Sequence, residues 1–583
     1  MLSELTVIKI KSYRRNNIMS KKILVVGGVA GGAGTAARAR RLDEDAEIIM
    51  FERGPHVSFS NCALPYHLSG VVKDCDDLVL MCPTNFAEQY NIDARVNNEV
   101  LSIDREAKTV EVKNLKSGET YTEDYDKLVL SPGANPIKPQ SIKGVNNDNV
   151  FTIRNVVDID KLNTYVEEND VEDIAVIGAG YIGIEIAENF IHNGKNVALV
   201  EAMDQILQPL DYDMAQILQK ELHDNGVNMI LSDALTEVHD DHIVVESGKK
   251  IDAEAVVLAI GVSPETELAE EAGLKIGKTG GIEVNHNYVT SDPDIYAVGD
   301  VIEVYSKIAR SKTRLPLAGP AQRQARAAAN HIYNIPNKNK GVIGSSVIRA
   351  FDYNAATTGL NEKQLKDAGI SYDFVYVIPT DKVGLMPDAN PLHFKLLYEV
   401  PTGKILGAQA VGKGNVDKRI DVIATSILLD ATVEDLTESE LAYAPLFSTP
   451  RNAVNQASLV ATNLINNRFR QVPVSKVREL VEKDAFIVDV REKEEYEMGH
   501  LVNAVNIPLS ELRERTDEIP KDQPVYLHCR SAQRSYNACL ALQGRDFDNV
   551  INISGSFLGI CCYEYFLDQT TDRDKIVTEY NFE

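Results

Sequence analysis

Two glycine-rich turns constrain the fold of this chain more than any other feature of its sequence. The first turn, 27–32, follows the apolar run 23–26, and the second turn, 178–183, follows the apolar run 174–177. Glycines in such a turn let a pyrophosphate come close to the N-terminus of the following helix. The two turns therefore predict two Rossmann-like units, each with a site for a dinucleotide.

The second turn carries the complete dinucleotide fingerprint. Gly178, Gly180 and Gly183 have the spacing G-x-G-x-x-G, and the next strand ends in Glu201. A carboxylate at that point accepts hydrogen bonds from ribose hydroxyls and repels a 2′-phosphate, and residues 202–203 offer no arginine to hold one. We therefore expect NADH rather than NADPH here. The residues expected at this site are Gly178, Gly180, Tyr181, Ile182, Gly183 and Glu201, and Gly261 is a further expected cofactor-binding residue.

The first turn is a weaker match to the same pattern. It reads Gly-Gly-Val-Ala-Gly-Gly, so that Val29 stands where the second glycine is usual. The strand expected over 47–51 is nevertheless closed by Glu52, which is again placed for ribose hydroxyls. Two such sites far apart in one chain predict two different dinucleotides.

Length and composition narrow the class of protein. A chain of 583 residues is too long to fold around one hydrophobic core, and its length predicts about three or four domains. The net charge of −26 argues against nucleic acid or an anionic membrane as the main partner, and no apolar run reaches the length of a membrane span. Seven cysteines without paired spacing favour a cytoplasmic protein. Residues 1–19 make a poor signal peptide, and we expect a disordered extension or an upstream start codon.

Three further stretches join the turns in a resemblance to a known family. They are 128–134, 259–261 and 295–300, which ends in Gly299 and Asp300. Together these motifs resemble the flavoprotein pyridine nucleotide-disulfide oxidoreductases from about Lys21 to Arg451. The resemblance implies FAD at the first turn, NADH at the second, and contact between Asp300 and the flavin ribityl chain. The residues it implies for FAD are Gly27, Gly28, Ala30, Gly31, Gly32, Glu52, Arg53, Gly133, Gly299 and Asp300.

One cysteine follows the first unit, within the stretch Ser-Phe-Ser-Asn-Cys-Ala-Leu-Pro-Tyr at 58–66. A lone cysteine is usually a small buried hydrophobe. The C-x4-C pair of two-cysteine reductases is missing, however, and the stretch resembles the single-cysteine coenzyme A disulfide reductases. One cysteine suffices for disulfide chemistry when the substrate brings the partner thiol. We therefore expect Cys62 to be a catalytic thiolate with a lowered pKa.

The resemblance also implies a site for coenzyme A. Its phosphates need cations, and the helix after the first turn carries Arg38, Arg40 and Arg41, which can share a face. The alternative is that these arginines form an ordinary solvated face. The substrate-binding residues implied by the resemblance are Arg38, Arg41, Ser58, Asn61 and Arg451.

Two positions bear on the choice of substrate. Tyr443 matches a family tyrosine that acts in the other subunit's active site as a proton donor or hydrogen-bond partner. Met386 stands where the family often has a second tyrosine, and a methionine cannot donate a proton. A coenzyme A thiolate leaves more easily when protonated, whereas a persulfide or polysulfide releases a more acidic sulfur species. Met386 therefore favours a persulfide or polysulfide substrate.

The C-terminal part has two further patterns. Residues 343–448 alternate short strands and helices, which suits the dimerisation domain of the same family and a homodimer. Residues 472–567 resemble one rhodanese domain, in which Cys529 and Arg534 bound a C-x4-R loop. This loop is one residue shorter than the C-x5-R loop of related phosphatases, and it suits sulfur. Its backbone N–H groups can hold an anionic persulfide on Cys529, with Arg530 and Arg534 adding positive charge. The alternative is an inactive docking domain.

The predicted fold is α/β, with two Rossmann-like dinucleotide-binding domains, an α+β dimerisation domain and a C-terminal α/β rhodanese domain. The predicted divisions are 1–19 (extension), 20–150 with 275–340 (FAD), 151–274 (NAD), 341–452 (dimerisation), 453–470 (linker) and 471–583 (rhodanese).

These features predict an FAD- and NADH-dependent reductase of coenzyme A persulfide or polysulfide, with sulfane sulfur carried on Cys529. The close alternative is a coenzyme A disulfide reductase. An NADH oxidase or peroxidase, with Cys62 cycling through sulfenic acid, and a non-catalytic coenzyme A sensor are more distant. No Cys/His spacing resembles a zinc ligand set, so no metal is expected. The cysteines expected only to pack or support structure are Cys75, Cys82, Cys561 and Cys562.

Overall fold

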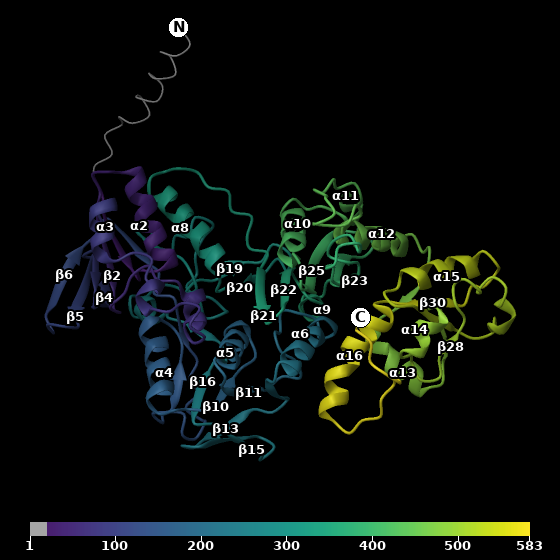
Figure 1. Ribbon diagram of the computed structural model, residues 1–583. Helices are drawn as coiled ribbons and strands as arrows, with labels where there is room; N and C mark the ends of the chain where they lie inside the picture. The colour runs from purple at the N-terminus through teal and green to yellow at the C-terminus, as the bar shows by residue number, and fades with distance from the viewer. Residues whose placement is uncertain (1–19, 583) are drawn as a thin grey trace, which may run out of the picture.

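The computed structural model describes residues 20–582, so the expected N-terminal extension lies outside the described residues (Figure 1). The first domain is built on a parallel five-stranded sheet, whose inner strands are mostly apolar, as expected for a sheet covered on both faces. Helices α2 and α8 pack against each other beside it. In hydrogen-bonding order the strands are β18 (Ile295–Ala297), β7 (Lys127–Leu130), β1 (Lys22–Val26), β2 (Glu47–Glu52) and β3 (Asp93–Val96), and the helices are α2 (Ala30–Leu42) and α8 (Ala318–Ile332).

The second domain repeats this architecture. Its parallel sheet has the order β12 (Asn228–Leu231), β11 (Asn196–Glu201), β10 (Asp173–Ile177), β16 (Ala255–Leu258) and β9 (Val150–Thr152), and its helices are α4 (Val156–Glu168), α5 (Tyr181–His192) and α6 (Tyr212–Asp224). Each domain also has a three-stranded antiparallel sheet, formed by β4 (Asn98–Asp104), β5 (Thr109–Asn114) and β6 (Thr120–Asp124) in the first and by β13 (Leu235–Val238), β14 (His242–Val245) and β15 (Lys250–Asp252) in the second. The two predicted Rossmann-like units are confirmed.

The glycines of the two turns are needed where backbone meets backbone. A Cβ atom on Gly32 would lie 1.8 Å from the carbonyl oxygen of Gly27, and one on Gly183 would lie 1.9 Å from that of Gly178. A Cβ on Gly180 would meet no atom within 4 Å. The last glycine of each turn therefore lets the helix pack closely on the turn that precedes it, while Gly180 borders open space.

The third domain is an antiparallel sheet with helices on it. The order is β21 (Ser345–Ala350), β22 (Tyr353–Gly359), β25 (Ile405–Gly412), β24 (Leu392–Glu399) and β23 (Tyr372–Val377), and the helices are α9 (Glu362–Asp367), α10 (Val416–Leu428), α11 (Val433–Thr437) and α12 (Ala453–Ile465). Val454, Ala457 and Ala461 of α12 are buried in the core of this sheet. The helix of the expected linker thus packs on the third domain, and only 466–470 connect it to the next strand.

The fourth domain is a parallel sheet that docks firmly on the second and third domains. Its order is β26 (Gln471–Val472), β30 (Val550–Ile553), β29 (Val525–His528), β27 (Phe486–Asp489) and β28 (Val505–Asn506), and its helices are α13 (Val477–Glu482), α14 (Lys493–Glu497), α15 (Gln533–Gln543) and α16 (Ser556–Thr570). Helix α16 lies along α6. The Tyr565 hydroxyl donates to Asp224 Oδ1 at 2.9 Å, and Gln471 Nε2 donates to the Phe374 carbonyl at 2.7 Å.

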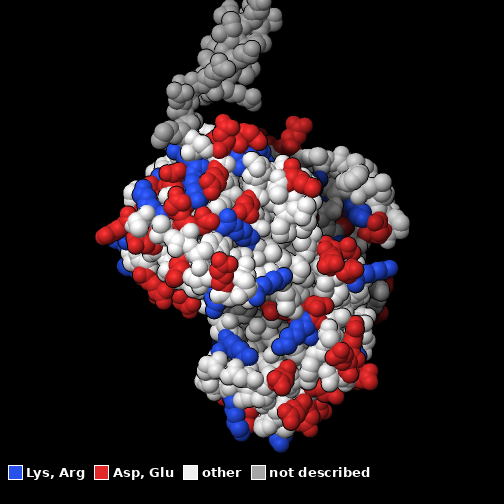
Figure 2. Space-filling view, turned by 90° about the vertical axis from the view of Figure 1, so that its left-hand side faces the viewer, with Lys and Arg blue, Asp and Glu red and all other residues white. Residues whose placement is uncertain are grey.

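Shorter elements complete the fold. They are η1 (Asn61–His67), η2 (Cys75–Leu78), α3 (Pro83–Tyr90), β8 (Ala134–Pro136), β17 (Val262–Pro264), α7 (Glu267–Glu271), β19 (Val304–Tyr305), β20 (Lys312–Thr313), η3 (Val474–Lys476) and η4 (Thr516–Glu518). Among residues 20–582, no helix combines the length and apolar character needed to cross a membrane. Acidic and basic side chains are interspersed over the face seen in Figure 2.

The second turn yields a stability prediction with a control in the same motif. Gly183→Ala should lower the free energy of unfolding by about 2–3 kcal/mol, because its methyl group overlaps the Gly178 carbonyl and α5 must move. Gly180→Ala, at the N-cap of α5, should cost less than about 1 kcal/mol. Thermal and denaturant unfolding of both variants measure the difference. Equal losses would show that backbone contact does not explain Gly183.

Candidate active site

The stretch around Cys62 lies directly on the first glycine turn. The Ser58 N–H donates to the Gly28 carbonyl at 2.8 Å, and Ser58 itself has a left-handed φ of 48°. The Leu80 N–H donates to the Ser58 carbonyl at 2.8 Å and fixes the far side of the stretch. Asn61 and Cys62 then begin η1, and both side chains are exposed. The expected catalytic thiol is therefore held against the turn expected to bind FAD.

Asp300 belongs to the same site as Cys62. It follows β18 and directly succeeds Gly299. Gly299 has a φ of +86°, and its N–H donates to Gln324 Oε1 at 2.7 Å. Burial raises the pKa of Asp300. The Asp300 carboxylate in turn contributes to raising the pKa of Cys62, so the two side chains lie within electrostatic range.

The expectation of a lowered pKa for Cys62 is wrong for the polypeptide itself. Desolvation by neighbouring protein atoms raises the pKa of this thiol although it is exposed, and the carboxylates of Glu185 and Asp300 raise it further. A thiolate is stabilised by nearby cations or helix N-termini, whereas the residues that act on Cys62 are acidic. The described residues around Cys62 therefore disfavour its thiolate form.

Glu185 is a site residue that the sequence reasoning missed. It lies on α5, the helix that follows the second turn and packs against η1. Burial raises the pKa of Glu185 to about 7, with a smaller contribution from Glu188. Its carboxyl group therefore exchanges protons near neutral pH beside Cys62. The available signal was an acidic residue in an otherwise apolar helical run.

The arginines of α2 divide into two kinds. Arg40 is buried, and its guanidinium donates to five backbone carbonyls, including those of Tyr90 and Ala46. Burial lowers the pKa of Arg38, and the charges of Arg326 and Arg41 lower it further. Arg38, Arg41 and Arg326 of α8 therefore form one basic cluster. Arg326 was not predicted, because only the packing of α8 on α2 brings it there.

The acidic residues at the strand ends are fixed to their turns in the same way. Glu52 Oε2 accepts from the Gly28 N–H at 2.9 Å, and Glu201 Oε2 accepts from the Ala179 N–H at 2.8 Å. The guanidinium of Arg53 pairs with both carboxylate oxygens of Glu265 at 2.7 and 2.8 Å. The carboxylates of Glu52 and Glu201 are thus each fixed beside a glycine turn.

The remaining expected residues lie on the third domain. Tyr443 is exposed, and Arg451 is exposed just before α12. In residues 20–582, no hydrogen bond or ion pair is seen between either side chain and Cys62 or α2. The loop of Met386 lies beside the loop of Tyr443, because the Val383 N–H donates to the Pro445 carbonyl at 3.2 Å.

The C-x4-R loop connects β29 to α15, and Cys529 is buried at its start. The Cys529 N–H donates to Ser556 Oγ at 3.1 Å. The Arg534 guanidinium donates to both oxygens of Glu495 at 2.6 and 2.7 Å. Glu495, and to a smaller extent Cys529, raise the pKa of Arg534, so both lie beside the guanidinium. Arg530 instead donates to the carbonyl of Phe582 at 3.4 Å.

Comparison with protein families accounts for all four domains. The model "Pyridine nucleotide-disulphide oxidoreductase" matches residues 21–325, and the dimerisation domain of the same family matches 346–454. The chain belongs to this family. A rhodanese-like domain matches residues 474–561. The protein is therefore an oxidoreductase of this family with a C-terminal rhodanese domain.

Three relatives resemble the chain over most of their length. The coenzyme A disulfide reductase of Staphylococcus epidermidis is 35% identical over 435 residues, which are 74% of this chain and 98% of that protein. The structure of reduced Bacillus anthracis CoADR-RHD is 41% identical with a TM-score of 0.91 and covers 95% of this chain and 99% of its own. An NAD-dependent persulfide reductase from A. fulgidus is 34% identical with a TM-score of 0.88 and covers 93% and 99%.

The family implies FAD and NAD(P)H, and the turns fit both groups. The space beside Gly180 is open, as the close approach of a pyrophosphate requires. Glu52 and Glu201 stand at the ends of β2 and β11, where a carboxylate contacts ribose hydroxyls. The first turn and the residues around Asp300 would hold FAD, and the second turn would hold the nicotinamide dinucleotide.

The acidic surroundings of Cys62 yield a pH prediction. Glu185→Gln removes one of the charges that raise the thiol's pKa, so the alkylation rate of Cys62 should begin to rise at a lower pH than in the wild type. The measurement is the pH dependence of iodoacetamide labelling at Cys62, followed by mass spectrometry. Glu168→Gln, an exposed change at the end of α4, is the control and should leave the profile unchanged. A shift to higher pH in Glu185→Gln would contradict the assignment.

Proposed function

We propose that this protein is an FAD- and NADH-dependent reductase of coenzyme A persulfide or polysulfide that releases sulfide and coenzyme A. The observation that carries the proposal is an exposed cysteine, Cys62, in a segment that is hydrogen-bonded to the first glycine turn, in a chain whose seven cysteines are all free. With no second protein thiol bonded to Cys62, the substrate must supply the other sulfur of the redox pair.

The relatives support this substrate class. One is described as a coenzyme A disulfide reductase, one as CoADR-RHD and one as a persulfide reductase. The latter two are similar to this chain over nearly its whole length, which includes the rhodanese domain. A rhodanese domain provides a carrier for sulfane sulfur, and a reductase limited to coenzyme A disulfide has no use for one.

Coenzyme A would bind to the basic cluster of Arg38, Arg41 and Arg326, with Arg451 contributed from the third domain. Guanidinium groups suit phosphates because they donate two parallel hydrogen bonds. Ser58 and Asn61 precede Cys62 in the same segment and would contact the thiol end of the carrier. The rhodanese residue Cys529 would hold sulfane sulfur beside Arg534 and exchange it with the carrier.

The chemistry at Cys62 follows from its position. The Cys62 thiolate would attack the carbon-bound sulfur of the coenzyme A persulfide, so that a bond forms between these two sulfurs and hydrosulfide leaves with the electron pair of the broken S–S bond. The product is a mixed disulfide between Cys62 and coenzyme A. NADH, through bound FAD, would supply the two electrons that restore the Cys62 thiolate and free coenzyme A. Glu185 is placed to exchange a proton near the thiol.

The loops of Met386 and Tyr443 would form part of a homodimer interface. Leu385 is 87% exposed, and Tyr443, Leu446 and Phe447 are also exposed in this pair of neighbouring loops. Large apolar side chains gathered on a surface mark a contact with another chain. In a two-fold dimer this surface would present Tyr443 to the partner's active site. Seven free cysteines suit a reducing compartment, and we place the enzyme in the cytoplasm.

The two cysteines should separate the two activities. Cys62→Ser should lower NADH-dependent sulfide release from coenzyme A persulfide at least about a thousandfold, since it removes the nucleophile, and should leave thiosulfate sulfurtransferase activity intact. Cys529→Ser should abolish thiosulfate sulfurtransferase activity and leave NADH-dependent sulfide release from coenzyme A persulfide intact. Cys82→Ser, an exposed change, is the control. NADH consumption in air without persulfide, at the rate seen with persulfide, would instead identify an NADH oxidase.

Met386 should influence the choice between persulfide and coenzyme A disulfide. Met386→Tyr adds a proton donor, so kcat/KM for coenzyme A disulfide should rise by about 10- to 100-fold relative to that for the persulfide. Met386→Phe fills the same space without a hydroxyl and is the control. If the ratio of the two kcat/KM values is unchanged in the tyrosine variant, Met386 does not determine substrate preference. That result would favour the alternative function, a coenzyme A disulfide reductase.

A further inference from the structure

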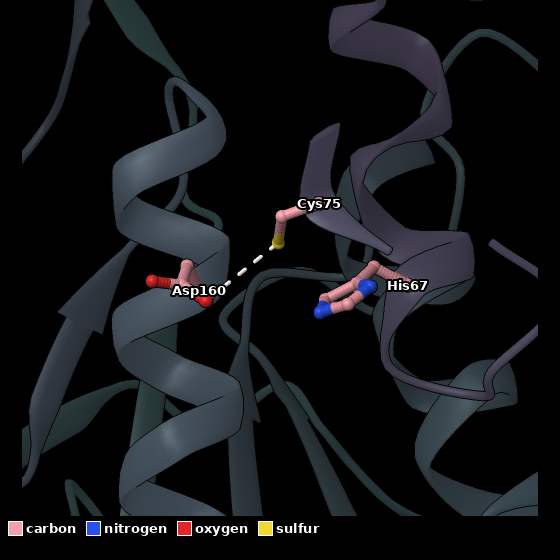
Figure 3. A group of neighbouring side chains, drawn as sticks. All are labelled: His67, Cys75 and Asp160. Carbon is pink, nitrogen blue, oxygen red and sulfur yellow. Dashed lines mark hydrogen bonds between the residues drawn. The ribbon is translucent and has the colours of Figure 1, made fainter. Parts of the chain in front are cut away.

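Three side chains with metal-binding atoms converge between the segment that holds Cys62 and helix α4. They are His67 at the end of η1, Cys75 at the start of η2, and Asp160 on α4. One ligand atom from each lies within 4.8 Å of the other two. Figure 3 shows the three side chains facing one another across the gap between α4 and the neighbouring segment.

The hydrogen bonds of this cluster orient its ligands. His67 Nδ1 lies 2.9 Å from the carbonyl oxygen of Val72, and this contact assigns the proton to Nδ1. Nε2 is then left with its lone pair free to bind a cation, which is the arrangement that supports a metal-bound histidine. Cys75 Sγ lies 3.7 Å from Asp160 Oδ1, so thiol and carboxylate are already neighbours.

The scaffold around the cluster is rigid. Leu68 after η1, Leu78 of η2 and Ile159 of α4 are buried in one hydrophobic core. The side chain of Asp74 caps η2 by accepting from the Asp76 N–H at 3.0 Å. The backbone positions of the three ligands are thus set by packing. The nearby carboxylate of Asp74 also favours a cation at the cluster.

We propose that His67, Cys75 and Asp160 bind one Zn²⁺ ion, with water as the fourth ligand. One sulfur, one imidazole nitrogen and one carboxylate oxygen form a donor set typical of zinc. Zinc bonds of about 2.0–2.3 Å place tetrahedral ligands about 3.3–3.8 Å apart, so side-chain motions of about 1 Å close the site. Binding forms a zinc–sulfur bond and releases the thiol proton to solvent.

The ion would clamp the segment that carries the reactive thiol. Cys62 is the second residue of η1 and His67 is the last, so zinc on His67 ties this element to α4 of the second domain. The three ligands are separate from every residue that we place in the dinucleotide, coenzyme A or sulfur sites. Zinc binding can therefore be tested without altering those sites.

The experiment is a zinc competition titration on the full-length, FAD-loaded protein with a chromogenic chelator. Wild type should bind one equivalent per chain. Cys75→Ser and Asp160→Asn should each lower the affinity at least about 100-fold, since loss of a supporting partner alone costs 10–100-fold. Cys82→Ser removes an exposed thiol outside the cluster and should bind as the wild type does. Flavin absorbance confirms that each variant is folded.

Two further measurements on the same proteins distinguish a specific three-ligand site from nonspecific metal binding to a thiol. Co²⁺ should give a thiolate-to-metal charge-transfer band in wild type and Cys82→Ser, and none in Cys75→Ser. Zn²⁺ should raise the melting temperature of wild type and leave that of Asp160→Asn unchanged. Failure of the wild type to bind one equivalent, or full binding by Cys75→Ser, would overturn the proposal. Asp160→Asn, on an exposed helix position, decides the matter if Cys75→Ser does not fold.

Discussion

The hydrogen bond from the Ser58 N–H to the Gly28 carbonyl is the contact on which the rest of the active site depends. It fixes the cysteine-bearing segment to the turn between β1 and α2, and the turn itself exists only because Gly32 lets the helix approach the carbonyl of Gly27. Nothing in the segment needs a second cysteine to hold it in place. A single thiol can therefore be exposed and still have a defined position relative to the first dinucleotide site.

The side chains that act on Cys62 are acidic, whereas a thiolate is stabilised by positive charge. Carboxyl groups of Glu185 and Asp300 face Cys62, while the positive charges lie farther off in the cluster of Arg38, Arg41 and Arg326. A bound phosphate carrier would neutralise the cluster, and the thiol would remain in acidic surroundings. The acidic neighbours therefore disfavour the thiolate form of Cys62.

Much of the fold follows from local sequence. The glycine turns, the apolar strand runs and the acidic residues at strand ends predicted both Rossmann-like domains, since each pattern is local and has one physical meaning. The C-x4-R loop was equally visible. Glu185, Arg326 and the His67 cluster were not predicted, because each depends on helices that meet only in the tertiary structure. The pKa of Cys62 was predicted in the wrong direction for the same reason.

The docking of the fourth domain has a consequence for how sulfur moves. Helix α16 lies along α6, and side-chain bonds such as that from Tyr565 to Asp224 join domains that are remote in sequence. A rhodanese domain seated in this way is not a swinging arm, and the short connection at 466–470 gives it little freedom. Under the proposed function, the element that moves sulfur between Cys529 and Cys62 would then be the long, flexible pantetheine chain of coenzyme A.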